Sequence, residues 1–247
     1  MKILVAVSKA PDTTSKVSFK DGDTKFNEDG VQWIINPYDE WYSLVRAVEL
    51  KEADPQTVIH LVTVGDASND AILRKALALG GDEAIRINAD ASDSYNTAAQ
   101  IAEVAKQGNY DLIFTGKETI DYNAMAVGSM IAGLLDLPYV SAVAKFDLQG
   151  NDAIAIHEIE GGEETVQITL PAVISSTKGM AKQRIPNMRG IMAARSKPIK
   201  VVEPIASDNL TEIVQYELPP AKESVKLIDA NNVEELVRIL HEDVKVI

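Results

Sequence analysis

Residues 114–128 have the residue types and the spacing that could bind a phosphate group. They begin at the end of a short apolar run that predicts a buried strand, and a helix is predicted from near Asn123 to about Leu135. A loop that leads from the carboxyl end of a parallel strand into a helix presents free backbone N–H groups, which attract anions. An ordinary connecting loop would show the same spacing. Neither G-x-G-x-x-G nor a P-loop is present, because Gly116-Lys117 lacks the leading glycine and the following Ser or Thr.

A second polar segment, Asn36-Pro37-Tyr38-Asp39-Glu40, precedes a predicted helix that contains Trp41. The proline favours an extended conformation at Asn36, from which the amide could contact a base or a sugar. The alternative is that Asn36 only belongs to the turn that begins the helix, which is the commoner role of such a residue.

A third feature is a local reversal of charge between positions 178 and 200. This stretch contains seven basic residues and no Asp or Glu, in a chain whose formal net charge is −13. A solvated loop would explain the pattern, but so would contact with an acidic partner or ligand. The basic residues are Lys178, Lys182, Arg184, Arg189, Arg195, Lys197 and Lys200.

The composition excludes several classes of function. The excess of 37 Asp and Glu over 24 Lys and Arg repels phosphate backbones and anionic lipid, so we expect no nucleic-acid partner. No apolar stretch approaches the ~20 residues that span a bilayer, so we expect no membrane insertion. The absence of cysteine excludes disulfides, Cys-ligated zinc and iron–sulfur clusters, and three separate histidines predict no metal site. The N-terminal residues predict a first strand rather than a signal peptide, so we expect a cytoplasmic protein.

The elements that must position these segments alternate along the first two-thirds of the chain. Short apolar runs separated by helical patterns are typical of a mostly parallel sheet covered by helices on both faces. Predicted strands are Ile3–Val7, Thr57–Val64, Ala84–Ile87 and Asp111–Thr115, and predicted helices contain Trp41–Val48, Ile72–Leu77 and Ala98–Ala105. We therefore predict an α/β fold with a mostly parallel, doubly wound, nucleotide-binding-like sheet.

After Pro138 the pattern changes to short alternating segments, which predict an antiparallel addition to that sheet. Residues 177–204 predict an exposed contact loop, residues 203–228 an extended arm with three prolines, and residues 233–240 a short helix. We expect an α/β domain over residues 1–200 and a C-terminal arm with its helix over residues 201–247. The alternating segments are Tyr139–Phe146, Ala153–Ile159, Thr165–Leu170 and Ala172–Ser176.

Four blocks in this order resemble the small, beta subunits of the electron transfer flavoproteins, and the resemblance extends from Lys2 to about Lys200. There are two departures from the family pattern. His157 stands where the family usually has Lys or Arg, and Met125-Ala126-Val127 stands where the family often has Asn-Gln-Thr. The four blocks are Ile3-Leu4-Val5-Ala6-Val7, Asn36-Pro37-Tyr38-Asp39-Glu40, Gly116-Lys117-Glu118-Thr119-Ile120-Asp121, and Glu158–Thr165 leading to Leu170-Pro171-Ala172-Val173.

The resemblance implies that this chain binds AMP, which is structural in the family, while the redox-active FAD is held mainly by a larger alpha subunit. It also implies that the arm, residues 201–247, contacts that alpha subunit in a heterodimer. The residues that the resemblance assigns to the AMP site are Ala6, Asn36, Pro37, Tyr38, Asp39, Val64, Gly116, Lys117, Glu118, Thr119, Ile120, Asp121, Tyr122, Asn123, Ala124, Met125, Ala126 and Val127.

The resemblance further implies a docking loop at about residues 175–190, in which an aliphatic side chain enters a pocket of an acyl-CoA dehydrogenase. We expect Met180 in Lys178-Gly179-Met180-Ala181-Lys182 to be this exposed anchor. The expected function is electron transfer from such dehydrogenases toward a membrane quinone oxidoreductase, with no catalysis by this chain alone. Two alternatives are a bifurcating complex, which binds a second FAD in place of AMP and uses NADH, and a stand-alone adenine-nucleotide-binding regulator.

Overall fold

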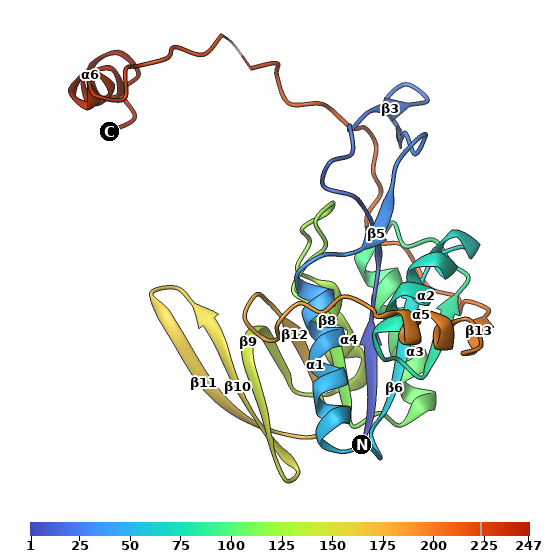
Figure 1. Cartoon of the computed structure of the whole chain (residues 1–247). Helices are drawn as coiled ribbons and strands as arrows, with labels where there is room; N and C mark the ends of the chain where they lie inside the picture. The colour runs from blue at the N-terminus through green and yellow to red at the C-terminus, as the bar shows by residue number, and fades with distance from the viewer. Residues whose placement is uncertain (223) are drawn as a thin grey trace. The chain divides into compact units, whose positions relative to one another are not determined.

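A nine-stranded, mostly parallel sheet is the frame of the first of two units (Figure 1). The computed structural model describes residues 1–222 and 224–247. The first unit contains residues 1–17 and 27–214, and the second contains residues 18–26 and 215–247. In order across the sheet the strands are β11 (Gly162–Thr169), β10 (Asp152–Ile159), β9 (Tyr139–Gln149), β12 (Ala172–Ser176), β8 (Leu112–Gly116), β1 (Lys2–Ala6), β6 (Val58–Val64), β7 (Glu83–Ile87) and β13 (Ile199–Val202).

Helices cover both faces of the sheet, as the sequence predicts for a doubly wound fold. Successive residues of β1 point to opposite faces: Ile3 and Val5 pack in one buried cluster with α1 and α2, while Leu4 and Ala6 pack in a second cluster with α3 and α4. The helices of this unit are α1 (Asp39–Ala53), the single 3-10 turn η1 (Ala67–Asn69), α2 (Asp70–Leu79), α3 (Ser94–Gly108), α4 (Val127–Leu135) and α5 (Met188–Ala194).

Parallel pairing in the centre of the sheet brings three strand ends to one edge. β1 pairs with β6 on one side and with β8 on the other, in a register that places Val5 beside Leu61 and Phe114. The three strands run in the same direction and in similar register. Their last residues, Ala6, Val64 and Gly116, therefore lie at the same edge of the sheet. Two short strands, β2 (Lys9–Pro11) and β5 (Trp33–Ile35), form a separate antiparallel pair.

The predicted antiparallel addition to the sheet is present. Its first strand, β9, joins it to the rest of the sheet by parallel pairing. β9 pairs parallel with β12 and antiparallel with β10, and β10 pairs antiparallel with β11. The predicted contact loop at residues 177–204 is wrong in its second half, because that half contains α5 and β13. β13 extends the parallel sheet beside β7, and it has only four residues, of which Lys200 and Val201 are exposed.

The second unit contains the short hairpin strands β3 (Phe19–Lys20) and β4 (Lys25–Phe26), helix α6 (Val233–Arg238) and a π-helical turn, η2 (Ile239–Asp243). The ring of Phe19 stacks on that of Tyr216 with 4.8 Å between centroids, and the Tyr216 N–H donates to the Asp23 carbonyl at 2.7 Å. Residues 203–222 and 224–228 form neither helix nor strand, as predicted for an extended arm. The division of the chain at residue 200 stays a prediction.

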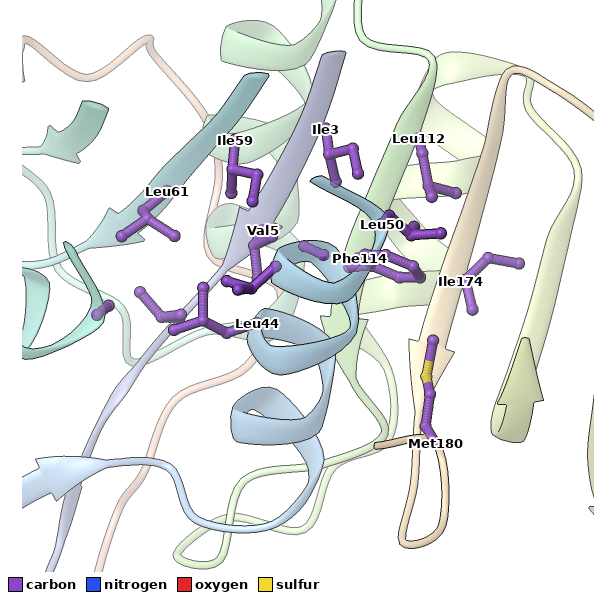
Figure 2. Packing of buried hydrophobic residues seen from close by; sticks show 14 of the residues in the cluster. Ile3, Val5, Leu44, Leu50, Ile59, Leu61, Leu112, Phe114, Ile174 and Met180 are labelled. Carbon is purple, nitrogen blue, oxygen red and sulfur yellow. The ribbon is translucent and has the colours of Figure 1, made fainter. Parts of the chain in front are cut away.

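Met180 belongs to the core, so the expectation that its side chain is exposed is wrong. It is 5% exposed and packs in the same cluster as Phe114 and Ile174; Figure 2 shows its side chain directed toward Ile174. The turn that precedes Met180 explains why its side chain points into the core. Gly179 has φ +108°, which a residue with a side chain rarely adopts, and the Met180 N–H donates to the Thr177 carbonyl at 3.4 Å.

Truncation of Met180 should therefore destabilise the fold. We expect Met180→Ala to lower the free energy of unfolding by about 2–5 kcal/mol, because it leaves a cavity in the core. Met188→Ala is the matched control, since Met188 lies only eight positions later and is 72% exposed; it should change stability by under ~0.5 kcal/mol. Urea denaturation of the full chain measures both, and equal midpoints for the two variants would contradict the placement of Met180.

Candidate functional site

A pocket of about 410 Å³ opens at the edge where β1, β6 and β8 end. Its walls include the loop between β8 and α4, and the first residues of α3 and α4. This is the place where an open α/β sheet usually binds ligands. The predicted binding residues that line it are Ala6, Val64, Gly116, Lys117, Glu118, Thr119, Asp121, Tyr122, Ala124, Met125, Ala126 and Val127.

The remaining predicted residues do not line the pocket. These are Asn36, Pro37, Tyr38, Asp39, Ile120 and Asn123. Asn36 is fully buried and its amide is not available to a base or sugar. The amide donates to the Glu118 carbonyl at 2.9 Å and accepts from the Ile120 N–H at 2.9 Å. Asn36 therefore holds the β8–α4 loop in place, which is a supporting role that the sequence did not distinguish from ligand contact.

Asp39 supports the same loop from the first residue of α1. Its carboxylate accepts from the Glu118 N–H at 3.3 Å. Burial raises the pKa of Asp39, although the hydrogen bond from the Glu118 N–H and the charge of Lys117 oppose that rise.

Several lining residues were not predicted. Ser8, Lys9 and Glu40 lie beside predicted residues, so the two N-terminal segments contain more of the site than the motifs indicated. Residues near the start of α3 could have been found by applying the strand-end rule to β7 as well as to β8. Thr211 and Ile213 had no local signal, because they reach the pocket from near the C-terminal end of the unit. The α3 residues are Ser94, Thr97 and Ile101, preceded by Ala91 and Ser92.

Glu40 is a buried acid in the wall of the pocket. It is 7% exposed, and its two carboxyl oxygens accept from the backbone N–H of Ser8 at 2.6 Å and from the Ser8 hydroxyl at 2.8 Å. Burial raises the pKa of Glu40 to about 8, and the nearby charges of Asp121 and Asp39 add to the rise. Near neutral pH this wall is therefore less negative than its residue types suggest.

Gly116 allows the end of β8 to approach the start of α1. A Cβ at this position would lie 2.7 Å from Cγ of Glu40 and 3.1 Å from its backbone nitrogen, so a side chain would force the two segments apart. The next residue, Lys117, pairs with Glu118 at 3.1 Å, and that hydrogen bond raises the pKa of Lys117. The second lysine of the pocket, Lys9, donates to the Ser68 hydroxyl at 2.9 Å.

The pocket has the groups that a phosphorylated, partly apolar ligand requires. Helix α4 begins at Val127, four residues later than predicted, and its first N–H groups have no partner within the helix. The positive end of the helix favours an anion there. The hydroxyls of Thr97 and Thr115, both from lining residues, are buried without a hydrogen-bond partner among the described residues. Unpaired donors of this kind suit a polar ligand.

The predicted docking residues lie apart from this pocket. Lys178, Gly179 and Lys182 are exposed, whereas Met180 is buried and Ala181 is half-buried. Farther along the same segment, exposed apolar side chains are found at Ile185, which is 87% exposed, and at three positions in α5. Those three are Met188, Ile191 and Met192.

Fold and pocket together define a protein of the doubly wound α/β class, and comparison with known proteins narrows the class to a family. The family model described as electron transfer flavoprotein domain matches residues 23–207. The chain is 35% identical to the electron transfer flavoprotein subunit beta of Bacillus subtilis (strain 168) over the whole of both chains. It is 31% identical to the subunit beta of Sus scrofa over 98% of this chain and 97% of the relative.

A further relative is the subunit beta of Syntrophomonas wolfei, with 38% identity over 90% of this chain and 87% of the relative. This chain therefore belongs to the electron transfer flavoprotein family, among its beta subunits. The resemblance that the sequence blocks indicated is confirmed. In the part of the chain that the structure describes, every helix is too short or too polar to cross a bilayer.

The buried acid generates a prediction about pH. The pKa of Glu40 lies above its ordinary value of 4.5, so the folded chain holds this proton at pH values where the unfolded chain has lost it. The stability that Glu40 contributes is therefore complete below pH 4.5 and is lost as the pH rises toward 8. Glu40→Gln can still accept from the Ser8 N–H and can donate to the Ser8 hydroxyl. We expect the urea midpoint of Glu40→Gln, relative to the original chain, to rise progressively from pH 5 to pH 8.

Glu52→Gln is the control for this measurement. The hydrogen bond from Arg184 lowers the pKa of Glu52, so this carboxylate is ionised throughout that range. The midpoint difference caused by Glu52→Gln should stay constant from pH 5 to pH 8. Parallel pH profiles for Glu40→Gln and Glu52→Gln would disprove the burial of an uncharged Glu40.

Proposed function

We propose that this chain is the small subunit of a heterodimeric electron transfer flavoprotein and that it binds AMP in the pocket at the edge of the sheet. The observation that carries the proposal is the pocket itself, with the start of α4, two unpaired threonine hydroxyls and two lysines around it. The phosphate would lie at the first turn of α4 and contact backbone N–H groups of residues 126–128. Side-chain donors from an Asn-Gln-Thr sequence are not required for this contact.

AMP is favoured over a second FAD by the size of the pocket. A volume of about 410 Å³ suits a mononucleotide, whereas FAD also has to place an isoalloxazine ring, a ribityl chain and a second phosphate. A second FAD would indicate the bifurcating alternative, in which the complex uses NADH. Denaturing the purified complex and counting the released FAD and AMP distinguishes the two: one FAD and one AMP are expected.

The heterodimer is supported by exposed apolar side chains in the C-terminal arm. Val214, Val225 and Leu227 are each at least 80% exposed, and residues 214–222 and 224–227 form neither helix nor strand. Exposed apolar surface of this kind marks an interaction site. We infer that the alpha subunit covers the arm and holds most of the FAD, which supplies the redox chemistry when bound. A stand-alone regulator would have no use for this exposed arm.

Docking of acyl-CoA dehydrogenases is assigned to Ile185 instead of Met180. Ile185 is the most exposed apolar side chain between residues 175 and 190, and it lies within the expected docking loop. Lys178, Lys182 and Arg189 add positive charge to the same segment, which would steer an acidic partner. In this function the chain shields FAD and docks electron donors, and the complex passes electrons toward a quinone oxidoreductase without a reaction catalysed by this subunit.

A negative charge placed in the pocket should weaken AMP retention. Ala124 lines the pocket and is exposed, so it tolerates a longer side chain. We expect Ala124→Glu, made in the full heterodimer, to raise the dissociation constant for AMP at least about tenfold through repulsion of the phosphate. Ala124→Gln has nearly the same shape without the charge and should have a much smaller effect. Equal AMP affinities of the Glu and Gln variants would argue against a phosphate at this position.

Truncation of the docking side chain should impair coupling without loss of stability. Ile185→Ala should raise the apparent KM for this protein in a dehydrogenase-coupled assay, because anchor residues often contribute ~2 kcal/mol or more to binding. Melting temperature and flavin content should stay unchanged. Ile159→Ala, in β10 of the same unit and also exposed, is the control and should leave KM unaltered. A normal KM for Ile185→Ala would show that dehydrogenases dock elsewhere.

A further inference from the structure

Residues 205–213, here named the strap, form one wall of the pocket although they contain no helix or strand. Thr211 and Ile213 line the pocket together with loops that lie more than 80 residues earlier in the chain. The strap is exposed along most of its length, with Ile213 at 37%. It therefore has little apolar burial of its own, and its position depends on hydrogen bonds to other elements.

Three of those hydrogen bonds converge on one carboxylate, that of Asp93, which is 1% exposed. One carboxyl oxygen accepts from the N–H of Leu210 at 3.2 Å and from both the N–H and the hydroxyl of Thr211, at 2.9 and 2.6 Å. The other oxygen accepts from the Asn96 N–H at 2.8 Å and so caps α3. The hydrogen bond from the Thr211 hydroxyl is the first cause of the lowered pKa of Asp93, which therefore stays ionised.

Two further side chains of α3 hold the strap. The Gln100 amide donates to the Ile205 carbonyl and accepts from the Ile205 N–H, both at 2.9 Å. The Asn96 amide donates to the Asn209 side chain at 2.8 Å. These contacts and those of Asp93 come from one face of α3 over its first two turns. The same turns contribute Ser94, Thr97 and Ile101 to the pocket, so strap and helix form two walls joined by shared side chains.

We propose that the strap is a closing wall that retains the nucleotide, with Asp93 as the positioning residue that holds the wall shut. The inference rests on the proposed function, because it concerns the ligand of the same pocket. A segment with few apolar contacts opens by local unfolding more readily than the core does. A nucleotide that lies against Thr211 and Ile213 would leave only when the strap opens, so the strength of these hydrogen bonds would set its residence time.

The two oxygens of Asp93 allow a selective test. All three donors from the strap meet one oxygen, whereas the cap of α3 uses the other. Asn is as good a cap as Asp, so Asp93→Asn can preserve α3 while an amide group replaces the acceptor of the strap. In the full heterodimer we expect AMP to dissociate faster by on the order of tenfold, because hydrogen bonds to a charged acceptor are lost. The amides of Leu210 and Thr211 should exchange hydrogen faster.

Two other variants make the test specific. Gln100→Leu removes both bonds to Ile205 and does not line the pocket, so faster AMP loss in this variant would come from the strap alone. Asp152→Asn is the matched control: this carboxylate also accepts from a threonine hydroxyl, that of Thr169 at 2.7 Å, but it lies in β10 outside the pocket. Its AMP release and the exchange of the strap amides should equal those of the original complex.

The outcomes separate this inference from the proposed function. If the original complex releases no AMP, the proposed function is wrong and the strap has no nucleotide to retain. If the original complex contains AMP, and Asp93→Asn and Gln100→Leu release it no faster, only the closing wall is disproved. Faster release with an unchanged melting temperature supports the strap, because a general loss of stability would lower the melting temperature as well as speed the release.

Discussion

The parallel pairing of β1 with β6 and with β8 is the constraint on which the rest of the site depends. Parallel strands that share a register end at one edge of the sheet. Ala6, Val64 and Gly116 therefore lie at the same edge, although they are far apart in the sequence. The chain then leaves the sheet through a loop at the end of each strand. Each loop leads to a helix or, after β1, to the short strand β2. The pocket is the space that remains between those loops, which is why its lining comes from so many separate segments.

Buried polar side chains give shape to the loop that the sheet alone would leave undefined. Asn36 uses both ends of its amide on the backbone of residues 118 and 120, and Ser8 satisfies both oxygens of Glu40. Each group is costly to bury unless it is paired, so each fixes the distance between the segments that it joins. The β8–α4 loop thereby has a defined path without secondary structure, and its backbone N–H groups are directed rather than free to find other partners.

The sequence predicted the frame well because apolar periodicity is a local property. It placed the central strands within a residue or two and located most of the β8–α4 loop in the pocket. It missed β13 because an edge strand of four residues buries too little to show a pattern, and it misplaced Met180 because the turn at Gly179 reverses the direction of the side chain. The capping role of Asp93 has a local signature in the sequence. Its hydrogen bonds to residues more than a hundred positions away have no such signature, so they could not be predicted.

The separation of the pocket walls along the chain has a consequence for synthesis. The first lining residue is Ala6 and the last is Ile213, so the pocket is complete only when nearly all of the 247 residues have left the ribosome. At a translation rate of roughly 5–20 residues per second, β1 emerges roughly 10–40 s before the strap. A nascent or truncated chain can form the central strands in that interval but cannot enclose a ligand. In the proposed function, nucleotide content is thus a measure of chain completion as well as of folding.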